Sequence, residues 1–208
     1  MSQLPDGELG NYNMTWKNFT RDNYLTLKGS VFCLSGEKTL SLIKDIALVL
    51  GLALLTGISA KIKVEIGAIP ITMQTLTVLL GVGLLGKKRA TLSQVTYFLG
   101  GLMGIPWFSR GGGMIYIMSP TFGYIIGFIF ATFLVGSLLE KGWNKSFKKT
   151  ALTMLFGSLV IYIPGLFWLS NFIDVSKILT IGFYPFILAD FLKVFLTTLI
   201  LSLRSNII

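Results

Sequence analysis

The feature that most constrains this chain is a series of long apolar stretches with few or no charged residues. Residues 120–139 and 150–172 contain no Asp, Glu, Lys or Arg, and residues 178–203 contain only two charged side chains. Each stretch reaches the roughly 20 residues that an α-helix needs to cross a bilayer. With 53% hydrophobic and 13% charged residues among 208, the chain has more apolar surface than a soluble domain of this length can bury. The sequence therefore predicts an all-α integral membrane protein.

Six transmembrane helices are expected after a polar N-terminal segment. The predicted spans are residues 46–60, 66–86, 90–105, 120–139, 150–172 and 185–203. The first span is short, but Lys44 and Lys61 at its ends can extend their ammonium groups to the membrane surface. We expect residues 1–40 to form a polar cytoplasmic extension, and residues 41–208 to form a six-helix transmembrane domain.

The distribution of basic residues predicts that both termini are cytoplasmic. In that orientation the outer loops carry only Lys61, Lys63, Arg110 and Lys177, and all other cations outside the last span fall on the inner side. Cytoplasmic loops of membrane proteins carry such an excess of Lys and Arg. The net charge of +9 is therefore explained by topology, and binding to nucleic acid is disfavoured. The Gly- and Pro-bearing connections then lie on the outer side, where a site would face the medium.

Two charged residues lie inside the last span, in the stretch FILADFLKVFL. Asp190 and Lys193 are three positions apart, so a helix places them on one face and within reach of each other. A charge at the centre of a lipid-embedded helix costs about 2.5–3.5 kcal/mol even on lenient scales, which makes such residues functional candidates. A carboxylate accepts hydrogen bonds and an ammonium donates them, so the pair suits a neutral polar group such as an amide or urea. The alternative is an internal ion pair that serves packing alone.

A second candidate group lies in the outer loop PWFSRGGGMIY. Arg110 offers a planar set of donors for a carboxylate or phosphate, and the adjacent Gly111, Gly112 and Gly113 expose backbone N–H groups that can surround an anion. The alternative is a flexible external hairpin with one solvated arginine. Side chains that are candidates for lining a pocket are Gln74, Tyr97, Trp107, Phe108 and Tyr116. Aromatic residues at these places are also typical of the interfacial belt, and Gln74 is equally compatible with a hydrogen bond at a helix start.

Small residues recur at every fourth position in two of the predicted spans. Gly123, Gly127 and Ala131 form one row, and Ala47 and Gly51 form the other. This spacing permits close contact between helices. The rows therefore indicate packing within the bundle or against a partner protein.

Several classes of function are disfavoured by what the sequence lacks. It has no histidine, the commonest proton shuttle and transition-metal ligand. It has no GxxxxGK[ST], HExxH or GxSxG motif. Its single cysteine, Cys33, excludes an intrachain disulfide. We therefore expect no enzymatic activity, no metal site and no cofactor.

Three segments of the chain resemble the BioY family, the biotin-binding S components of energy-coupling factor (ECF) transporters. They are AKIKVEIGAIPITMQTLTVLLGVGLLG at residues 60–86, the GLMGIPWFSRGGG and SPTFGYIIGF stretches within residues 101–128, and FILADFLK in the last span. The resemblance runs from about residue 40 to residue 205. It implies a six-helix ECF S-component fold in the bacterial cell membrane that captures biotin from outside. It also implies delivery of the vitamin together with a transmembrane T component and ATPase subunits.

The resemblance further implies which residues bind biotin. The implied ligand residues are Arg110, Gly111, Gly112, Gly113, Asp190 and Lys193, and the implied contacts with the T component are Ala47 and Gly51. Asp190 would accept hydrogen bonds from the ureido N–H groups, and Lys193 would neutralise it or donate to the ureido carbonyl. Arg110 and the glycine N–H groups would take the carboxylate, although the ligand can also be placed the other way round.

The sequence departs from the family pattern at a few positions, and several alternatives stay open. Ser119 and Phe122 replace two glycines of the usual turn, and Trp107 stands where a smaller aliphatic residue is common. These side chains leave open the same fold tuned to another small vitamin or a biotin precursor. A structural or assembly protein, in which Asp190 and Lys193 only pair, is the alternative from another class. A transporter that works without ECF partners also fits the sequence.

Overall fold

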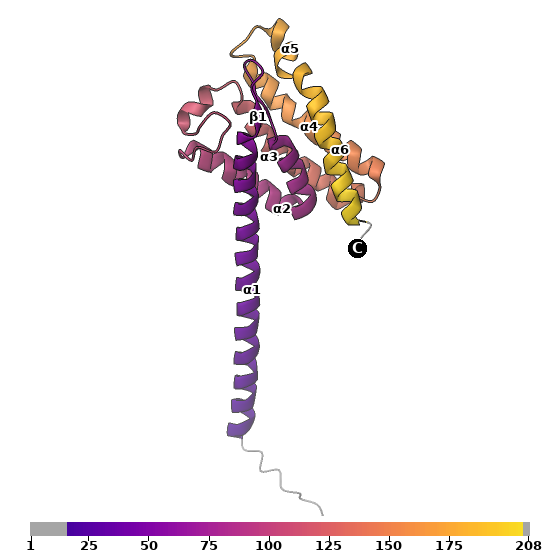
Figure 1. Cartoon of the computed structure of the whole chain (residues 1–208). Coiled ribbons are helices and arrows are strands. Elements are labelled where there is room, and N and C mark those ends of the chain that lie inside the picture. The colour runs from indigo at the N-terminus through magenta and orange to yellow at the C-terminus, as the bar shows by residue number, and fades with distance from the viewer. Residues whose placement is uncertain (1–15, 206–208) are drawn as a thin grey trace, which may run out of the picture. The chain divides into compact units, whose positions relative to one another are not determined.

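The computed structural model describes the backbone of residues 16–205 and the side chains of residues 38–204, and the chain divides into two units, 1–44 and 45–208. Helix α1, Trp16–Lys61, begins in the first unit and ends in the second (Figure 1). The expected N-terminal extension, residues 1–40, is therefore helical from Trp16 onward, and its residues 1–15 lie outside the described part of the chain.

The second unit contains a short hairpin followed by the remaining helices. Strand β1, Lys63–Val64, pairs antiparallel with β2, Ile71–Thr72. The helices are α2 (Gln74–Leu102), the 3₁₀ helix η1 (Met114–Met118), α3 (Phe122–Leu138), the π-helical turn η2 (Leu139–Trp143), α4 (Phe147–Leu169), the 3₁₀ turn η3 (Val175–Lys177), α5 (Ile178–Gly182) and α6 (Tyr184–Ser205). Helix α3 packs between α2 and α4, and α6 packs on α2 and α4.

Four helical segments within the described residues are long and apolar enough to cross a membrane. They are Lys38–Lys61, Phe122–Trp143, Phe147–Leu169 and Val175–Arg204. These segments contain the predicted spans 46–60 and 185–203, and they match 120–139 to within four residues and 150–172 to within three residues at each end. Helix α2 is not among them, because every 18-residue stretch of it includes Lys87, Lys88 and Arg89.

The structure corrects the boundaries of the two predicted spans 66–86 and 90–105. Helical structure begins only at Gln74, because the preceding residues form a loop and strand β2. It continues to Leu102 with one interruption at Gly86, whose φ of 78° and ψ of 172° are not helical. A glycine adopts this conformation at little cost because it has no Cβ. Lys87, Lys88 and Arg89, which lie between the two predicted spans, are therefore helical and directly follow the interruption.

The predicted contact row in α3 is confirmed as a packing surface against α4. A Cβ atom added to Gly123 would lie 2.3 Å from the carbonyl oxygen of Pro164, and one added to Gly127 would lie 2.6 Å from that of Ile161. Ala131 is fully buried on the same side. Backbones can approach this closely only where the side chains are small.

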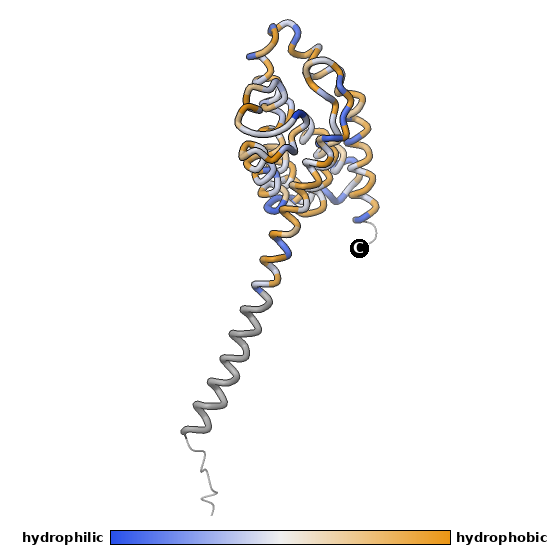
Figure 2. Tube along the Cα trace, turned by 60° about the vertical axis from the view of Figure 1, so that its left-hand side comes forward, coloured by the Kyte–Doolittle hydropathy of each residue, from blue (hydrophilic) through white to orange (hydrophobic). Residues whose placement is uncertain are grey.

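Hydrophobic residues occur along most of the trace of the second unit (Figure 2), and many of the large ones are exposed. Ile163 and Phe167 of α4 and Leu188 of α6 are among the most exposed large hydrophobic residues. Such exposure is unfavourable in water and favourable in lipid, so it agrees with a membrane location. Ala47 and Gly51 of α1 are also exposed, and no atom lies within 4 Å of a Cβ added to Gly51.

Candidate functional site

A cavity lies among α3, α4, α6, the β2–α2 connection and the loop before η1. Its apolar lining consists of Ile69, Pro70, Ile125, Phe128, Ile161 and Phe186. Its polar lining consists of Thr72, Gln74, Thr75, Ser109, Tyr116, Thr121, Tyr124, Tyr162, Asp190 and Lys193. Small-molecule sites combine apolar walls with convergent polar groups, and this cavity has both, with more polar than apolar residues in its lining.

One end of the cavity carries the charged pair predicted from the last span. The Lys193 Nζ atom lies 2.8 Å from the Asp190 Oδ1 atom, so the predicted contact between the two residues is confirmed. The hydroxyl of Tyr162, from α4, donates a hydrogen bond to the other carboxylate oxygen, Oδ2. Asp190 is only 8% exposed and Lys193 only 5%. The two opposite charges thus neutralise each other inside the protein, and the phenol ties α4 to α6.

The ring of Tyr162 is held in place by neighbouring aromatic residues. Its centroid lies 4.8 Å from that of Phe183 with nearly perpendicular planes, and 6.1 Å from that of Tyr124 in a similar arrangement. Edge-to-face contacts of this kind stabilise a fixed ring orientation. The Tyr124 hydroxyl in turn donates to the carbonyl oxygen of Gly182, at 2.9 Å. This packing aims the Tyr162 hydroxyl at the carboxylate.

A chain of hydroxyl groups forms a second polar region of the cavity. The Tyr116 hydroxyl lies 2.8 Å from Ser109 Oγ and 2.8 Å from Thr121 Oγ1. Ser119 Oγ continues the chain at 2.9 Å from Thr121 Oγ1. Hydroxyl groups both donate and accept, so this network can adapt to either kind of polar group.

Of the five side chains predicted to line a pocket, Gln74 and Tyr116 line the cavity, whereas Tyr97, Trp107 and Phe108 do not. Tyr97 lies behind Gln74 and accepts a hydrogen bond from its side-chain Nε2 at 2.8 Å. The Tyr97 hydroxyl donates to the carbonyl oxygen of Trp107, at 3.2 Å. Phe108 is fully buried against the rings of Tyr97 and Tyr116. These aromatic residues hold the loop that carries the hydroxyl network.

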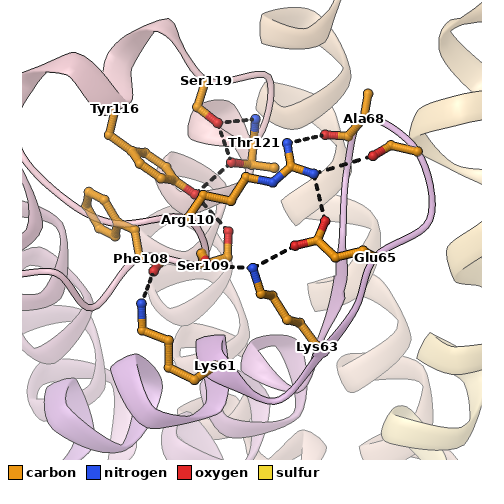
Figure 3. Close-up of polar contacts among 11 residues, drawn as sticks. Lys61, Lys63, Glu65, Ala68, Phe108, Ser109, Arg110, Tyr116, Ser119 and Thr121 are labelled. Atoms are coloured by element: carbon orange, nitrogen blue, oxygen red, sulfur yellow. Dashed lines mark hydrogen bonds and ion pairs between the residues drawn. The ribbon is translucent and has the colours of Figure 1, made fainter.

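Arg110 does not line the cavity, and its guanidinium group is bound by the loop between β1 and β2. Its Nη2 atom lies 2.7 Å from Glu65 Oε2, and its Nη1 atom donates to the carbonyl oxygen of Ala68 at 3.2 Å. Lys63 binds the other oxygen of Glu65 at 2.6 Å and the carbonyl oxygen of Ser109 at 2.9 Å. We call these contacts the outer latch, formed by Lys63, Glu65 and Arg110. Figure 3 shows that it joins the hairpin to the 106–113 loop.

Lys61 adds a further tie between the end of α1 and the same loop. Its Nζ atom donates to the carbonyl oxygen of Phe108 at 2.7 Å (Figure 3). The outer latch and Lys61 thus join the end of α1 and the β1–β2 hairpin to the 106–113 loop through charged side chains. The flanking Lys63 and Arg110 lower the pKa of Glu65 below its ordinary value of 4.5, because both donate hydrogen bonds to its charged form.

The three glycines after Arg110 have mainly conformational roles in this structure. Gly111 and Gly113 have positive φ angles of 128° and 90°, which only glycine adopts readily. Their N–H groups donate to the carbonyl oxygens of Phe108 and Gly101, at 3.2 and 2.7 Å. Gly112 packs so closely that an added Cβ would lie 2.3 Å from the carbonyl oxygen of Ile105. Two of the three N–H groups expected to surround an anion are therefore already bound to the protein.

Sequence reasoning missed several residues of this site. Tyr162 is the most important, because nothing in an apolar span marks one tyrosine as the partner of a carboxylate 28 positions further on. Ser109 lies in the 106–113 loop and Thr121 follows η1, but nothing in the sequence distinguishes these small polar side chains from others nearby. Glu65 is the missed residue that the sequence could most readily have indicated. It is the single acidic residue in the AKIKVEIG segment, and a predicted outer arginine would need a partner.

Comparison with known proteins identifies the relatives of this chain. A family model described as the BioY family matches residues 30–207. A protein of Pyrococcus horikoshii named probable biotin transporter BioY is 41% identical over 151 residues, which cover 72% of this chain and 89% of the relative. The protein named biotin transporter BioY in Thermotoga maritima is 37% identical over 146 residues, covering 69% of this chain and 85% of the relative.

A solved structure shares the fold. The crystal structure of the S-component for biotin from an ECF-type ABC transporter aligns with a TM-score of 0.70 at 26% identity, over 80% of this chain and 93% of that one. The predicted all-helical fold of the ECF S-component type is therefore confirmed, as is a multi-pass location in the cell membrane. Because the family model spans most of the sequence and both relatives cover more than two thirds of it, this chain belongs to the BioY family.

Proposed function

We propose that this protein captures biotin at the outer face of the cell membrane as the substrate-binding component of an ECF transporter. It is a transport protein and not an enzyme, in keeping with its family. The observation that carries the proposal is the cavity with a buried carboxylate, ammonium and phenol at one end and a hydroxyl network in its other polar region. Biotin likewise has a ureido ring at one end, a carboxylate at the other and an apolar body between them.

The charged end of the cavity suits the ureido ring. A carboxylate has about four acceptor sites, and Asp190 uses only two of them for Lys193 and Tyr162. The remaining two can accept the ureido N–H groups. An ammonium has three N–H donors, and Lys193 uses one of them for Asp190. Another can reach the ureido carbonyl, so the pair binds a neutral group without losing its own neutrality.

Arg110 is the group that we assign to the ligand carboxylate. In this structure it already binds a carboxylate, that of Glu65, at 2.7 Å. An incoming carboxylate can replace Glu65 by simple exchange, since the donor geometry of the guanidinium stays the same. We assign Gly111, Gly112 and Gly113 the task of placing Arg110. The hydroxyl groups of Ser109, Tyr116 and Thr121 supply further donors along the path of the ligand tail.

Binding of a ligand as large as biotin requires that the walls of the cavity move. The cavity has a volume of only about 50 Å³, which suffices for a few water molecules. Pockets for small molecules are usually about 300–1,000 Å³. When the ligand carboxylate displaces Glu65 from Arg110, the 62–73 connection is released. The cavity can then widen to the volume that biotin requires.

The proposed membrane topology has six spans with both termini in the cytoplasm. The interruption at Gly86 divides α2 into the second and third spans, and the basic residues that follow it lie on the inner side. Residues 1–40 form the cytoplasmic extension and residues 41–208 the biotin-binding domain. Delivery involves a T component and ATPase subunits, and the exposed Ala47 and Gly51 contact the T component. The open space at Gly51 supports this assignment.

The proposal is tested by calorimetric titration of the detergent-purified protein with biotin. The Asp190→Asn variant removes the buried charge, and Asp174→Asn makes the same chemical change at an exposed position outside the cavity. We expect tight binding by the native protein and the Asp174 variant, and loss of binding by the Asp190 variant. Parallel titrations with dethiobiotin and with an unrelated vitamin distinguish a biotin site from a precursor site. An absence of heat with well-folded protein would refute the assignment of biotin.

A further inference from the structure

A second cavity lies at the opposite end of α3 and α6 from the ligand cavity. We call it the inner cavity, and the two cavities share no lining residue. The inner cavity has a volume of about 380 Å³. The polar residues of its lining are Lys87, Glu140, Asn144 and Arg204, and the large apolar ones are Val82, Leu139 and Leu201. Neither the family resemblance nor the proposed transport function uses these residues.

The inner cavity exists because α2 is interrupted and its neighbours come very close on either side. Gly86, at the interruption, has a positive φ of 78° and open space at its Cβ position. A Cβ added to Gly83 would lie 2.3 Å from Leu201 Cδ1 of α6, and one added to Gly136 of α3 would lie 2.6 Å from Lys87 Cα. These close contacts hold α3 and α6 against α2, and the interruption of α2 at Gly86 leaves the inner cavity between the three helices.

Two cations from distant parts of the sequence line this cavity. Lys87 follows the break in α2, and Arg204 lies in the last turn of α6. Within residues 38–204, neither side chain has a carboxylate within ion-pair distance. The Lys87 Nζ atom lies 4.0 Å from the ring centroid of Phe133, on the exposed apolar face of α3. The ammonium is therefore held beside an exposed aromatic side chain.

The charges around the inner cavity are predominantly positive. Glu140 is the only carboxylate in its lining. Lys141 and Lys145 neighbour Glu140 in the sequence, and the Lys145 side chain folds over Gly142 with its Nζ atom 3.7 Å from the added Cβ position. Unpaired cations at the membrane surface attract anionic lipids, with about 1 kcal/mol for each Lys or Arg. An apolar wall that ends in two cations matches the shape of a phospholipid, with its acyl chain beside its phosphate.

We propose that the inner cavity binds an anionic phospholipid. Lys87 and Arg204 contact the headgroup phosphate, the Asn144 amide donates to the headgroup, and one acyl chain lies along Val82 and Leu201. The proposal rests on the membrane placement of the bundle described above, but not on the identity of the vitamin. A bound lipid would connect α2, α3 and α6 across the break at Gly86, where the protein itself provides no continuous helix.

The test uses the full chain purified in a neutral detergent, and the probe is phosphatidylglycerol. Native mass spectrometry counts the lipids that stay bound, and a titration followed by thermal unfolding gives the affinity. Phosphatidylcholine tests the need for net negative charge, and inorganic phosphate tests whether a free anion suffices. The variant is Lys87→Gln/Arg204→Gln, and the matched control is Lys148→Gln/Lys149→Gln, which removes two exposed cations at the start of α4, outside the cavity.

We expect one tightly retained phosphatidylglycerol on the native protein and on the control. The cavity variant should bind it about tenfold more weakly or worse, since two charges are lost. A Glu140→Gln variant should bind it more tightly, because the only carboxylate of the lining is gone. Equal weakening in the variant and the control would overturn the proposal in favour of general surface attraction. It would equally be overturned if inorganic phosphate stabilised the protein as well as the lipid does, or if Glu140→Gln weakened binding.

These outcomes do not depend on whether biotin is the ligand. Lipid binding is measured without any vitamin, and the titrations with biotin serve only as a check of folding at the other end of the bundle. Lys87 and Arg204 are partly or fully exposed, so their replacement by glutamine leaves the buried packing intact. A failed titration with biotin would leave the lipid result standing, and the reverse also holds.

Discussion

Tyr162, Asp190 and Lys193 form a buried triad. Substitutions of single members and of all three together distinguish a role in ligand binding from a structural role. In Asp190→Asn the ammonium of Lys193, only 5% exposed, loses its counter-charge. Removing one partner of a buried ion pair typically costs about 3–5 kcal/mol, because a buried charge is left uncompensated. At about 2–4 °C per kcal/mol for a chain of this size, the melting temperature should fall by roughly 6–20 °C.

The triple variant Tyr162→Phe/Asp190→Leu/Lys193→Met replaces every polar group of the triad by an apolar one of similar size. Exchange of a whole buried ionic group for apolar residues is often neutral or stabilising by about 1–4 kcal/mol. The melting temperature should therefore recover to the native value or exceed it. Biotin binding should not recover, because hydrogen bonds to charged groups contribute about 1.5–3 kcal/mol each. The loss of two such bonds weakens binding by at least about a hundredfold.

Thermal unfolding in detergent and calorimetric titration with biotin measure the two effects on the same samples. A triple variant that is stable but does not bind would establish that the triad serves recognition. If the triple variant bound biotin with native affinity, the pair would be structural, as one reading of the sequence allows. If Asp190→Asn alone melted at the native temperature, the electrostatic argument for the buried pair would be wrong.

Further predictions concern other parts of the molecule. Tyr162→Phe alone should weaken biotin binding by about tenfold, measured by titration, because Asp190 loses a hydrogen bond to its charged form. Glu65→Gln should open the outer latch and speed up biotin association in stopped-flow measurements. Because the pKa of Glu65 is lowered, its contribution is fully present above pH 4.5 and is lost only as the pH falls through the lowered pKa. Acid well below pH 4.5 should therefore have the same effect in the native protein. Gly112→Ala should destabilise the protein by about 1–3 kcal/mol in thermal unfolding, because the added Cβ would clash with the carbonyl oxygen of Ile105. Gly104→Ala is the control: nothing lies within 4 Å of its Cβ position, so only the cost of its positive φ should appear. Gly51→Leu should keep biotin binding and abolish biotin uptake by cells that contain the ECF partners, because its side chain projects into open space.

Local geometry explains what could be predicted from the sequence. The contact between Asp190 and Lys193 follows from helical spacing alone, and the structure places their charged atoms 2.8 Å apart. The packing of Gly123 and Gly127 follows from the four-residue repeat of small side chains. Both depend only on the period of a single helix, so no knowledge of the bundle is needed.

Features that depend on how distant segments meet could not be predicted. Tyr162 and Asp190 are 28 positions apart and come together only because α4 and α6 pack side by side. The partner of Arg110 is Glu65, 45 positions earlier, because a hairpin folds over the 106–113 loop. The spans 66–86 and 90–105 were misplaced for a similar reason. The cations after Gly86 look like a loop in sequence, but a glycine with positive φ lets helical structure resume directly with them.

The structure also shows why a structural and a functional role for the charged pair do not exclude each other. The carboxylate of Asp190 binds an ammonium and a phenol, so the pair is buried without leaving a charge uncompensated. Each partner nevertheless keeps hydrogen-bonding capacity that is directed at the cavity they line. A neutral ligand can use that capacity without bringing a charge that would have to be desolvated. The same neutrality favours a neutral group at this end, in keeping with our proposal that the ligand carboxylate binds near Arg110. Charge balance thus supports the proposal that the triad binds the ureido ring.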